Sequence, residues 1–419
     1  MQERIRENIS QPEELERIYR ADKKSFESDF EIVYPEIRET EIGRFWKIRL
    51  DYDKPVETSS ELHRLDVIVL IIACTITGFL IKLPEIFNLD LKEPFYYLKN
   101  AGIIVFFGLS LYAIWTNKIF ERKKLNVILV SFLIPVVYIN LLPSSHDSNS
   151  INLAYMHLPL LMWCVYGFIF INFETVDKIR RIDYIKYNGD LAILGAIILI
   201  AGGILTGITI GLFSAIKVHI ESFYMQWVAI SGLVSAPIVA TYIIRNYPAL
   251  TNKIAPIIAN IFSPLVLITL IVFLINIPVS GIDLFNDREF LLIFNAMLLG
   301  VMGIIVFSIS ETSIHKKQKF SEMVLFVLTL VTLVIDLFAL SAIFYRLSEF
   351  GITPNRMAVV GSNLLIFGNI VFIMIDLYKV NFKNADIKSV EFTIAKYLPV
   401  YMLWTLIVVF GFPFIFGMK

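Results

Sequence analysis

The fold is decided by residues 321–345, which read SEMVLFVLTLVTLVIDLFALSAIFY. The stretch is apolar almost throughout, and Glu322 and Asp336 are its only charged residues. A helix needs about 20 mostly apolar residues to cross a hydrocarbon layer about 30 Å thick. Because a helix satisfies its own backbone hydrogen bonds, it is the form that such a stretch takes in a membrane. These residues therefore predict a membrane-spanning helix.

Similar apolar stretches recur along the rest of the chain, which is 57% hydrophobic and 18% charged. Soluble domains have about 45–50% apolar and about 25% charged residues. The alternation of a membrane β-barrel is not present. The sequence therefore predicts an all-α integral membrane protein, a polytopic bundle of about eleven transmembrane helices over residues 61–419. The predicted spans lie near 65–83, 101–116, 125–142, 151–172, 190–213, 223–244, 254–277, 289–310, 321–345, 354–378 and 392–414.

The charges indicate a sided protein. The 37 basic and 37 acidic residues give a formal net charge of zero, which argues against a nucleic-acid partner. Loops that follow even-numbered spans hold 16 lysines and arginines, and those on the other side hold 8. Because loops rich in lysine and arginine stay in the cytoplasm, we expect a cytoplasmic N-terminus and an external C-terminus.

Residues 1–60 are polar and charged and precede the first span. Leu15, Ile18 and Tyr19 repeat at helical spacing, and a second helix is expected after Tyr34-Pro35. Two short amphipathic helices bury little core by themselves. We therefore expect a helical cytoplasmic extension that docks on the cytoplasmic loops, or that contacts a partner protein or a membrane surface.

The ninth and tenth spans carry the main candidate site. A carboxylate at Asp336, near the middle of the membrane, costs several kcal/mol unless it is paired or protonated. Asp336 is therefore either functional or a structural group bonded to a neighbouring helix. Arg346 and Arg356 lie in the link between these spans, and Arg356 falls in a helix first turn, where the dipole disfavours positive charge.

Two interpretations of the arginines remain open. A fixed pair beside exposed helix N–H groups suits a phosphate or a carboxylate. Alternatively, Glu349 neutralises one of them in a structural ion-pair cluster. The predicted substrate-binding residues are Asp336, Arg346, Glu349, Asn355, Arg356 and Asn363.

The middle of the link has a structural explanation. Gly351 suits the left-handed end of one helix, Thr353 the N-cap of the next, and Pro354 its first turn. In the fifth span, Gly203, Gly207 and Gly211 lie four residues apart on one helix face. Small residues at that spacing predict close packing of a neighbouring helix, or alternatively a dimer interface.

Catalytic and metal-binding patterns do not stand out. The five histidines are scattered outside any His-Glu-x-x-His pattern, and the sequence holds no Gly-x-Ser-x-Gly elbow. Cys74 and Cys164 are isolated within apolar runs. The sequence therefore predicts neither a catalytic residue nor a metal or other cofactor.

Residues 345–356, YRLSEFGITPNR, resemble the Tyr-Gly-x-Thr-Pro-Asn-Arg-like signature of bacterial multipass proteins in domain-of-unknown-function family 4153. Residues 264–268 are similar to that family's mid-domain pattern. Residues 11–13, 34–36 and 45–46 are similar to the extension of its Bacteroidota-type members. The likeness spans about residues 60–415, and Phe350 stands where the signature has tyrosine. The resemblance implies a bacterial inner-membrane protein and no established activity.

Three classes of function remain. The favoured one is binding or transport of a small anionic or lipid-like substrate through the bundle, because of Asp336 and the two arginines. The second is a sensor or scaffold without catalysis that uses residues 1–60 to contact a cytoplasmic partner. The third is a membrane transferase acting on a lipid-linked substrate, which needs clustered acid or base groups at one membrane face.

Overall fold

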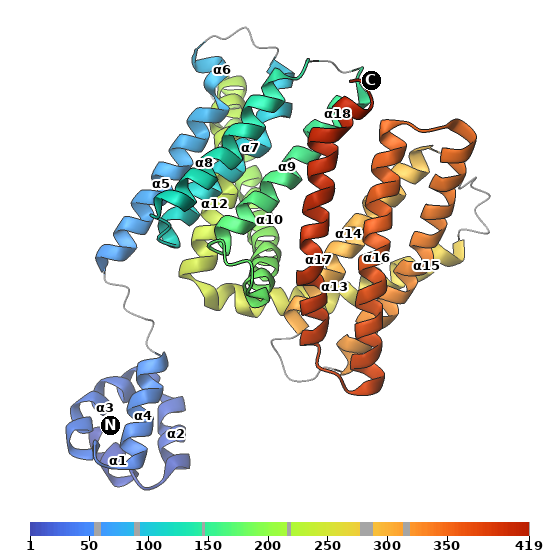
Figure 1. Cartoon of the computed structure of the whole chain (residues 1–419). Helices are drawn as coiled ribbons and strands as arrows, with labels where there is room; N and C mark the ends of the chain where they lie inside the picture. Colours follow the sequence, from blue (N-terminus) through green and yellow to red (C-terminus); the bar gives the residue numbers. More distant parts are fainter. Residues whose placement is uncertain are drawn as a thin grey trace. The chain divides into compact units, whose positions relative to one another are not determined.

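The structure is a computed structural model, and it describes residues 1–53, 60–87, 93–144, 147–215, 219–276, 288–312 and 319–418. Every regular element in these ranges is helical (Figure 1). The chain divides into two compact units, Met1–Val67 and Ile68–Lys419, and the division falls within the helix of the first predicted span. The prediction of an all-α fold is confirmed.

Within residues 1–53, the first unit contains four helices rather than the two that were predicted. They are α1 (Gln2–Glu7), α2 (Pro12–Ala21), α3 (Lys23–Ile37) and α4 (Glu41–Asp53). Leu15, Ile18 and Tyr19 are buried, as their spacing predicts. The helix expected after Tyr34-Pro35 is α4, which begins at Glu41, whereas Pro35 itself lies in the last turn of α3.

An aromatic core holds these four helices together. The Trp46 ring centroid lies 5.4 Å from that of Tyr19 and 5.1 Å from that of Phe26, and Phe30 stacks on Phe26. Trp46 is 2% exposed, and Phe26 and Phe30 are fully buried. The premise that this extension buries little core by itself is therefore wrong, and its docking stays a prediction. Helices α1 and α3 supply the apolar residues that the two predicted helices lack.

The first unit should lose stability in acid. Glu16 accepts hydrogen bonds from Arg49 (3.0 Å) and Arg20 (2.8 Å), and these bonds hold its pKa below the usual 4.5. A carboxyl whose pKa is lowered by folding stabilises the fold above its unfolded pKa, and this contribution is lost as the pH falls through the folded pKa. We expect a fragment of residues 1–53 to lose about 1 kcal/mol or less below pH 4.5. Urea unfolding followed by Trp46 fluorescence measures this loss.

Glu16→Gln should remove part of that pH dependence by weakening the fragment already at neutral pH. Glu13→Gln is the matched control, because Glu13 is an exposed carboxylate on the same helix. If Glu16→Gln left both the neutral stability and its acid dependence unchanged, the contribution of these bonds would be disproved.

The second unit is built of long helices, and nine of the helices that the structure describes are long and apolar enough to cross a membrane. The other two predicted spans lie on α13 and α14, whose apolar stretches, Ala259–Ile275 and Asn295–Glu311, are shorter. All the predicted spans lie on helices, although the second helix begins earlier than expected. The elements are α5 (Ser60–Ile81), α6 (Leu83–Ile86), α7 (Glu93–Thr116), α8 (Arg122–Leu141), α9 (Asn149–Phe170), α10 (Lys178–Ala215), α11 (Glu221–Phe223), η1 (Tyr224–Ala229), α12 (Ile230–Asn246), α13 (Pro248–Asn276), α14 (Arg288–Thr312), α15 (Lys319–Phe350), α16 (Pro354–Lys383), α17 (Lys388–Leu406), η2 (Ile407–Gly411) and α18 (Phe412–Ile415).

Two hydrophobic clusters divide the second unit into lobes. The first lobe comprises α5, α7, α8, α9 and α12, with Tyr112 and Leu158 in its core. The second lobe comprises α13 to α16, with Leu298, Leu328 and Ile370 in its core. Helix α10 contacts α12 and α14, and α17 contacts α9 and α16, so these two helices join the lobes (Figure 1).

Prolines free two carbonyl groups near the C-terminus, and side chains of other helices bind both. A proline has no N–H to donate to the carbonyl four residues before it. Four residues before Pro399, the Ala395 carbonyl accepts a hydrogen bond from Arg181 of α10 (3.1 Å). Four residues before Pro413, the Val409 carbonyl accepts one from Tyr138 of α8 (3.2 Å). The C-terminal helices are therefore bound to both α8 and α10.

The predicted packing of the glycine face on α10 does not occur within the described part of the chain. A Cβ atom added at Gly203 or Gly207 meets no atom within 4 Å, and the surroundings of Gly211 lie outside the described residues. This half of α10 is mostly exposed, so no neighbouring helix covers it. Close approach occurs instead at Gly108, against Thr77 of α5, and at Gly361, against Trp404 of α17.

Candidate functional site

Arg356 is bound to the end of the preceding helix. Its Nη1 donates to the carbonyls of Phe350 (2.6 Å) and Gly351 (2.7 Å), and its guanidinium lies 5.5 Å from the Phe350 ring centroid. Glu349 is exposed. Within the described ranges no ion pair joins Glu349 to Arg356, whose guanidinium is bound by backbone carbonyls instead.

The turn between α15 and α16 has the structure that its sequence predicts. Gly351 has φ +75°, in the left-handed region. The Thr353 hydroxyl accepts a hydrogen bond from the Arg356 N–H (3.3 Å), and Pro354 is the first residue of α16. These residues shape the turn.

The other predicted site residues lie at separate contacts. Asn355 donates to Asn149 of α9 (2.9 Å), and Asn363 donates to Asn295 of α14 (2.8 Å). Asp336 is fully buried in the second lobe. None of the six predicted residues lines the cavities described below. The structure therefore does not gather them into one binding site.

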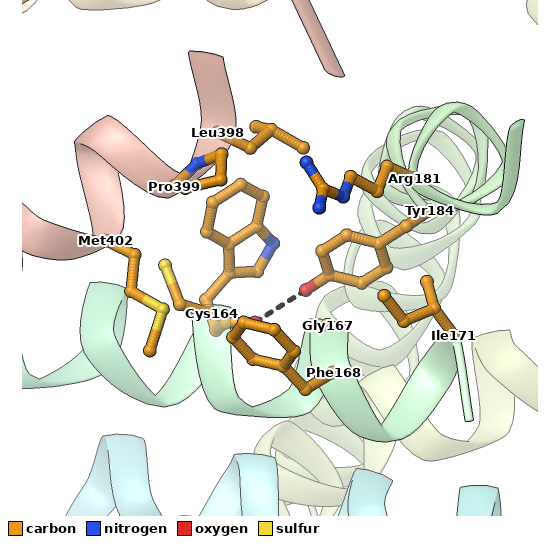
Figure 2. Close-up of a pocket in the computed structure, with 10 residues that line it drawn as sticks. Cys164, Gly167, Phe168, Ile171, Arg181, Tyr184, Leu398, Pro399 and Met402 are labelled. Carbon is orange, nitrogen blue, oxygen red and sulfur yellow. Dashed lines mark hydrogen bonds between the residues drawn. The ribbon is translucent and has the colours of Figure 1, made fainter. Parts of the chain in front are cut away.

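A small cavity lies beside Pro399 of α17 (Figure 2). Its volume is about 70 Å³, well below the roughly 300–1,000 Å³ of typical ligand sites. Arg181 at its rim donates to the carbonyls of Ala395 and Thr175 (2.6 Å), and the Tyr184 hydroxyl donates to the Trp163 carbonyl (2.7 Å). The polar groups of Arg181 and Tyr184 are therefore bound to backbone carbonyls. The lining residues are Trp163, Cys164, Gly167, Phe168, Ile171, Arg181, Tyr184, Leu398, Pro399 and Met402.

A much larger cavity of about 870 Å³, here named the α7/α8 cleft, lies between α5, α7 and α8. Its apolar part is formed by Leu80, Leu83, Phe95, Ile103, Ile104, Phe107, Leu129, Phe132, Leu133 and Val136. Its polar part is formed by Tyr96, Lys99, Asn100, Asn140 and Ser144, at the start of α7 and just after or near the end of α8. The cleft is therefore polar at one end and apolar along the rest of its length.

Lys99 is the charged group of this cleft, and it is only 6% exposed. Its Nζ donates to the Leu142 carbonyl (2.8 Å) and to the Ser144 hydroxyl (3.1 Å). An ammonium group has three N–H donors, so one remains after these two bonds. Within the described ranges, no carboxylate lies within 4 Å of this Nζ. A buried ammonium is costly without a counter-ion, so this end of the cleft favours an anion.

A pair of asparagines joins the two walls at the polar end. Asn100 donates to the Asn140 Oδ1 (3.2 Å), and Asn140 donates to the Asn100 Oδ1 (2.9 Å). Their amide groups also donate to the carbonyls of Tyr96 and Val136. These amide donors are engaged with each other and with backbone, so the pair links α7 to α8. It does not use the remaining N–H donor of Lys99.

The cleft is open along α8. Leu129 and Leu133 line it and are 63% and 53% exposed, whereas Phe132 between them is 5% exposed. The apolar walls of the cleft are therefore accessible from the exposed face of α8.

Lys99 was not predicted as a site residue, because the second span was expected to begin at residue 101, which leaves this lysine in a loop. Helix α7 begins at Glu93 and carries Lys99 into the cleft. Asn100 and Asn140 lie 40 residues apart, and their pairing has no local signal. The local signal that could have indicated this site is the polar pair Lys99-Asn100, which follows two tyrosines by about one helical turn.

No protein-family model, curated protein or solved structure matches the chain, so the resemblance of residues 345–356 to family 4153 stays a prediction and a function must be supported by the cleft itself.

Proposed function

We propose that this protein is an integral membrane protein that binds an amphiphilic ligand with an anionic headgroup in the α7/α8 cleft. The observation that carries the proposal is a cavity of about 870 Å³ with apolar walls, at whose polar end a buried Lys99 has no carboxylate within reach among the described residues. This site replaces the arginine pair of the α15–α16 link as the place where the favoured class of ligand binds.

The nine long apolar helices support insertion in a membrane. The start of α7 and the end of α8 belong to the side whose loops are poorer in lysine and arginine. With a cytoplasmic N-terminus, the polar end of the cleft lies at the external side of the bilayer. The headgroup then sits near the external surface of a bacterial inner membrane, with the hydrocarbon directed inwards along α7 and α8.

The chemistry of the walls fits an amphiphile. An ammonium group binds phosphate or carboxylate as a point charge. Hydrocarbon beside Ile103, Phe107 and Leu133 replaces apolar surface that is otherwise left in the cavity. Because Leu129 and Leu133 are exposed, a lipid reaches the cleft sideways from the bilayer.

Lys99→Gln should lower the affinity for an anionic amphiphile about tenfold or more, because a hydrogen bond to a charged group contributes roughly 1.5–3 kcal/mol. The measurement is equilibrium binding of radiolabelled phosphatidic acid to the purified full chain in neutral detergent. Diacylglycerol with the same acyl chains should bind the wild type and the variant equally, since it lacks the phosphate.

Lys123→Gln is the matched control, because Lys123 is an exposed lysine at the opposite end of α8. It should leave binding of phosphatidic acid unchanged. Equal affinity of the wild type and Lys99→Gln for phosphatidic acid would refute the proposed headgroup site.

The first unit favours a second candidate function, that of a sensor or scaffold. It has a core of its own, yet Ile32, Phe45 and Ile48 of α3 and α4 are 56%, 60% and 69% exposed. Exposed apolar groups on a small folded unit suit contact with a partner protein. Removing residues 1–53 should abolish partner capture under this function and leave binding in the α7/α8 cleft intact.

A further inference from the structure

The second lobe buries a carboxyl group whose charge is not compensated. Asp336 of α15 is fully buried, and neither of its carboxyl oxygens has a hydrogen-bond partner among the described residues. The core of the second lobe, which includes Ile335, Ala339 and Ile370, is apolar. A buried carboxylate without a counter-charge or hydrogen bonds is strongly unfavourable. No described residue supplies a positive charge or a hydrogen bond at this position.

Two further polar side chains lie at the same place. Asp336 and Asn369 lie about equally far from the turn that joins α15 to α16, and these two helices pack against each other and run antiparallel, so both residues lie at about the same depth. The Tyr401 hydroxyl of α17 accepts a hydrogen bond from the Asn369 Nδ2 (3.0 Å). Asn369 is 1% exposed, and its Oδ1 also has no partner within the described part of the chain. Three buried acceptor oxygens, two of Asp336 and one of Asn369, are thus left without a donor.

Several charged groups of the packed helices are engaged elsewhere, and Lys396 of α17 is exposed. Asp376 of α16 binds Lys379 (2.7 Å) and Thr393 (2.6 Å), and it lies seven residues, about 10 Å along the helix, from Asn369. Arg356 binds the end of α15. Glu311 of α14 interacts with charges on α10 and α17, and the described side chains of α13 include no charged group. None of these groups neutralises Asp336.

We propose that Asp336, Asn369 and Tyr401 form a binding site for a small monovalent cation, a proton or an alkali ion, inside the second lobe. The shared chemistry is a single positive charge bound by a carboxyl group, with the Asn369 carbonyl and the Tyr401 hydroxyl as neutral oxygen ligands. The site is independent of the α7/α8 cleft, which lies in the other lobe and has the opposite charge preference.

The test uses the full chain in neutral detergent and dicyclohexylcarbodiimide, an apolar reagent that modifies protonated carboxyl groups. Peptide mapping by mass spectrometry measures the adduct on Asp336 over a pH series with choline as the only added cation, and again with sodium or potassium chloride. We expect the adduct to decrease as the pH rises. A further decrease with sodium or potassium at constant pH identifies an alkali ion, and insensitivity to both identifies the proton alone.

Asn369→Ala separates a binding role from a structural one without removing the carboxyl group. It should raise the alkali-ion concentration that half-protects Asp336 about tenfold, or, for a proton site, shift the pH midpoint of modification. Asn381→Ala on the same helix is the control, because Asn381 binds only the Glu322 and Leu377 carbonyls. An Asp336 that is never modified, or one modified equally at every pH and salt, overturns the proposal, whatever the result at the α7/α8 cleft.

Discussion

Trp46→Ala should unfold the first unit. Trp46 is 2% exposed and contacts the rings of Tyr19 and Phe26, while the Arg49 guanidinium lies 4.7 Å from its ring centroid. Truncating a buried tryptophan to alanine costs about 3–5 kcal/mol. A domain of this size rarely has more than about 3–5 kcal/mol of stability from its core. Circular dichroism of residues 1–53 should therefore lose most of its helical signal.

Phe45→Ala is the matched control for this prediction. Phe45 is the neighbouring aromatic residue on α4 but is 60% exposed, so its removal should change the unfolding free energy little. A cooperative, helical Trp46→Ala fragment would contradict the core described for α1 to α4. Equal destabilisation by both substitutions would mean that the face of α4 that carries Phe45 is packed as well.

Gly361→Leu should destabilise the second unit by about 1–3 kcal/mol or more, the typical cost of overpacking. Any side chain at Gly361 of α16 overlaps the Trp404 ring of α17. That ring packs edge-on against Phe412 at 5.9 Å, so it has little freedom to move away. Thermal unfolding of the full chain in detergent can be followed by a thiol-reactive dye, because Cys74 and Cys164 are both free and partly buried.

Gly203→Leu serves as the comparison on α10. Nothing lies within 4 Å of a Cβ atom at Gly203, so leucine there should leave the transition unchanged or raise it slightly. If Gly203→Leu lowered the transition as much as Gly361→Leu, the glycine face of α10 would be a packed interface, as between two copies of the chain.

The long helices were predictable because a run of some 20 apolar residues is a local signal. The four helices of the first unit were harder to predict. The apolar residues of α3 nevertheless repeat at helical spacing, and all four are buried: Phe26, Phe30, Val33 and Ile37. The helix predicted after Tyr34-Pro35 is present as α4, but the helix before it, α3, was not predicted and continues past Pro35.

The candidate site was less predictable because it depends on contacts between distant segments. Arg356 lies at the N-terminal end of α16, where its charge is unfavourable, but also at the C-terminal end of α15, whose carbonyls attract it. Considering one helix end alone therefore suggested a ligand where the backbone of the neighbouring helix is the partner. Lys99 was missed because its burial depends on contacts with Leu142 and Ser144, which lie more than 40 residues later in the chain.

The two carbonyls that prolines free near the C-terminus have a consequence for the order of assembly. Ala395 and Val409 obtain their hydrogen bonds from Arg181 and Tyr138, which are synthesised much earlier. Until both donors are in place, these helices carry two backbone oxygens without these partners, and such groups are costly to bury. Helices α17 and α18 therefore complete their backbone hydrogen bonding by packing against α8 and α10, which precede them in the chain.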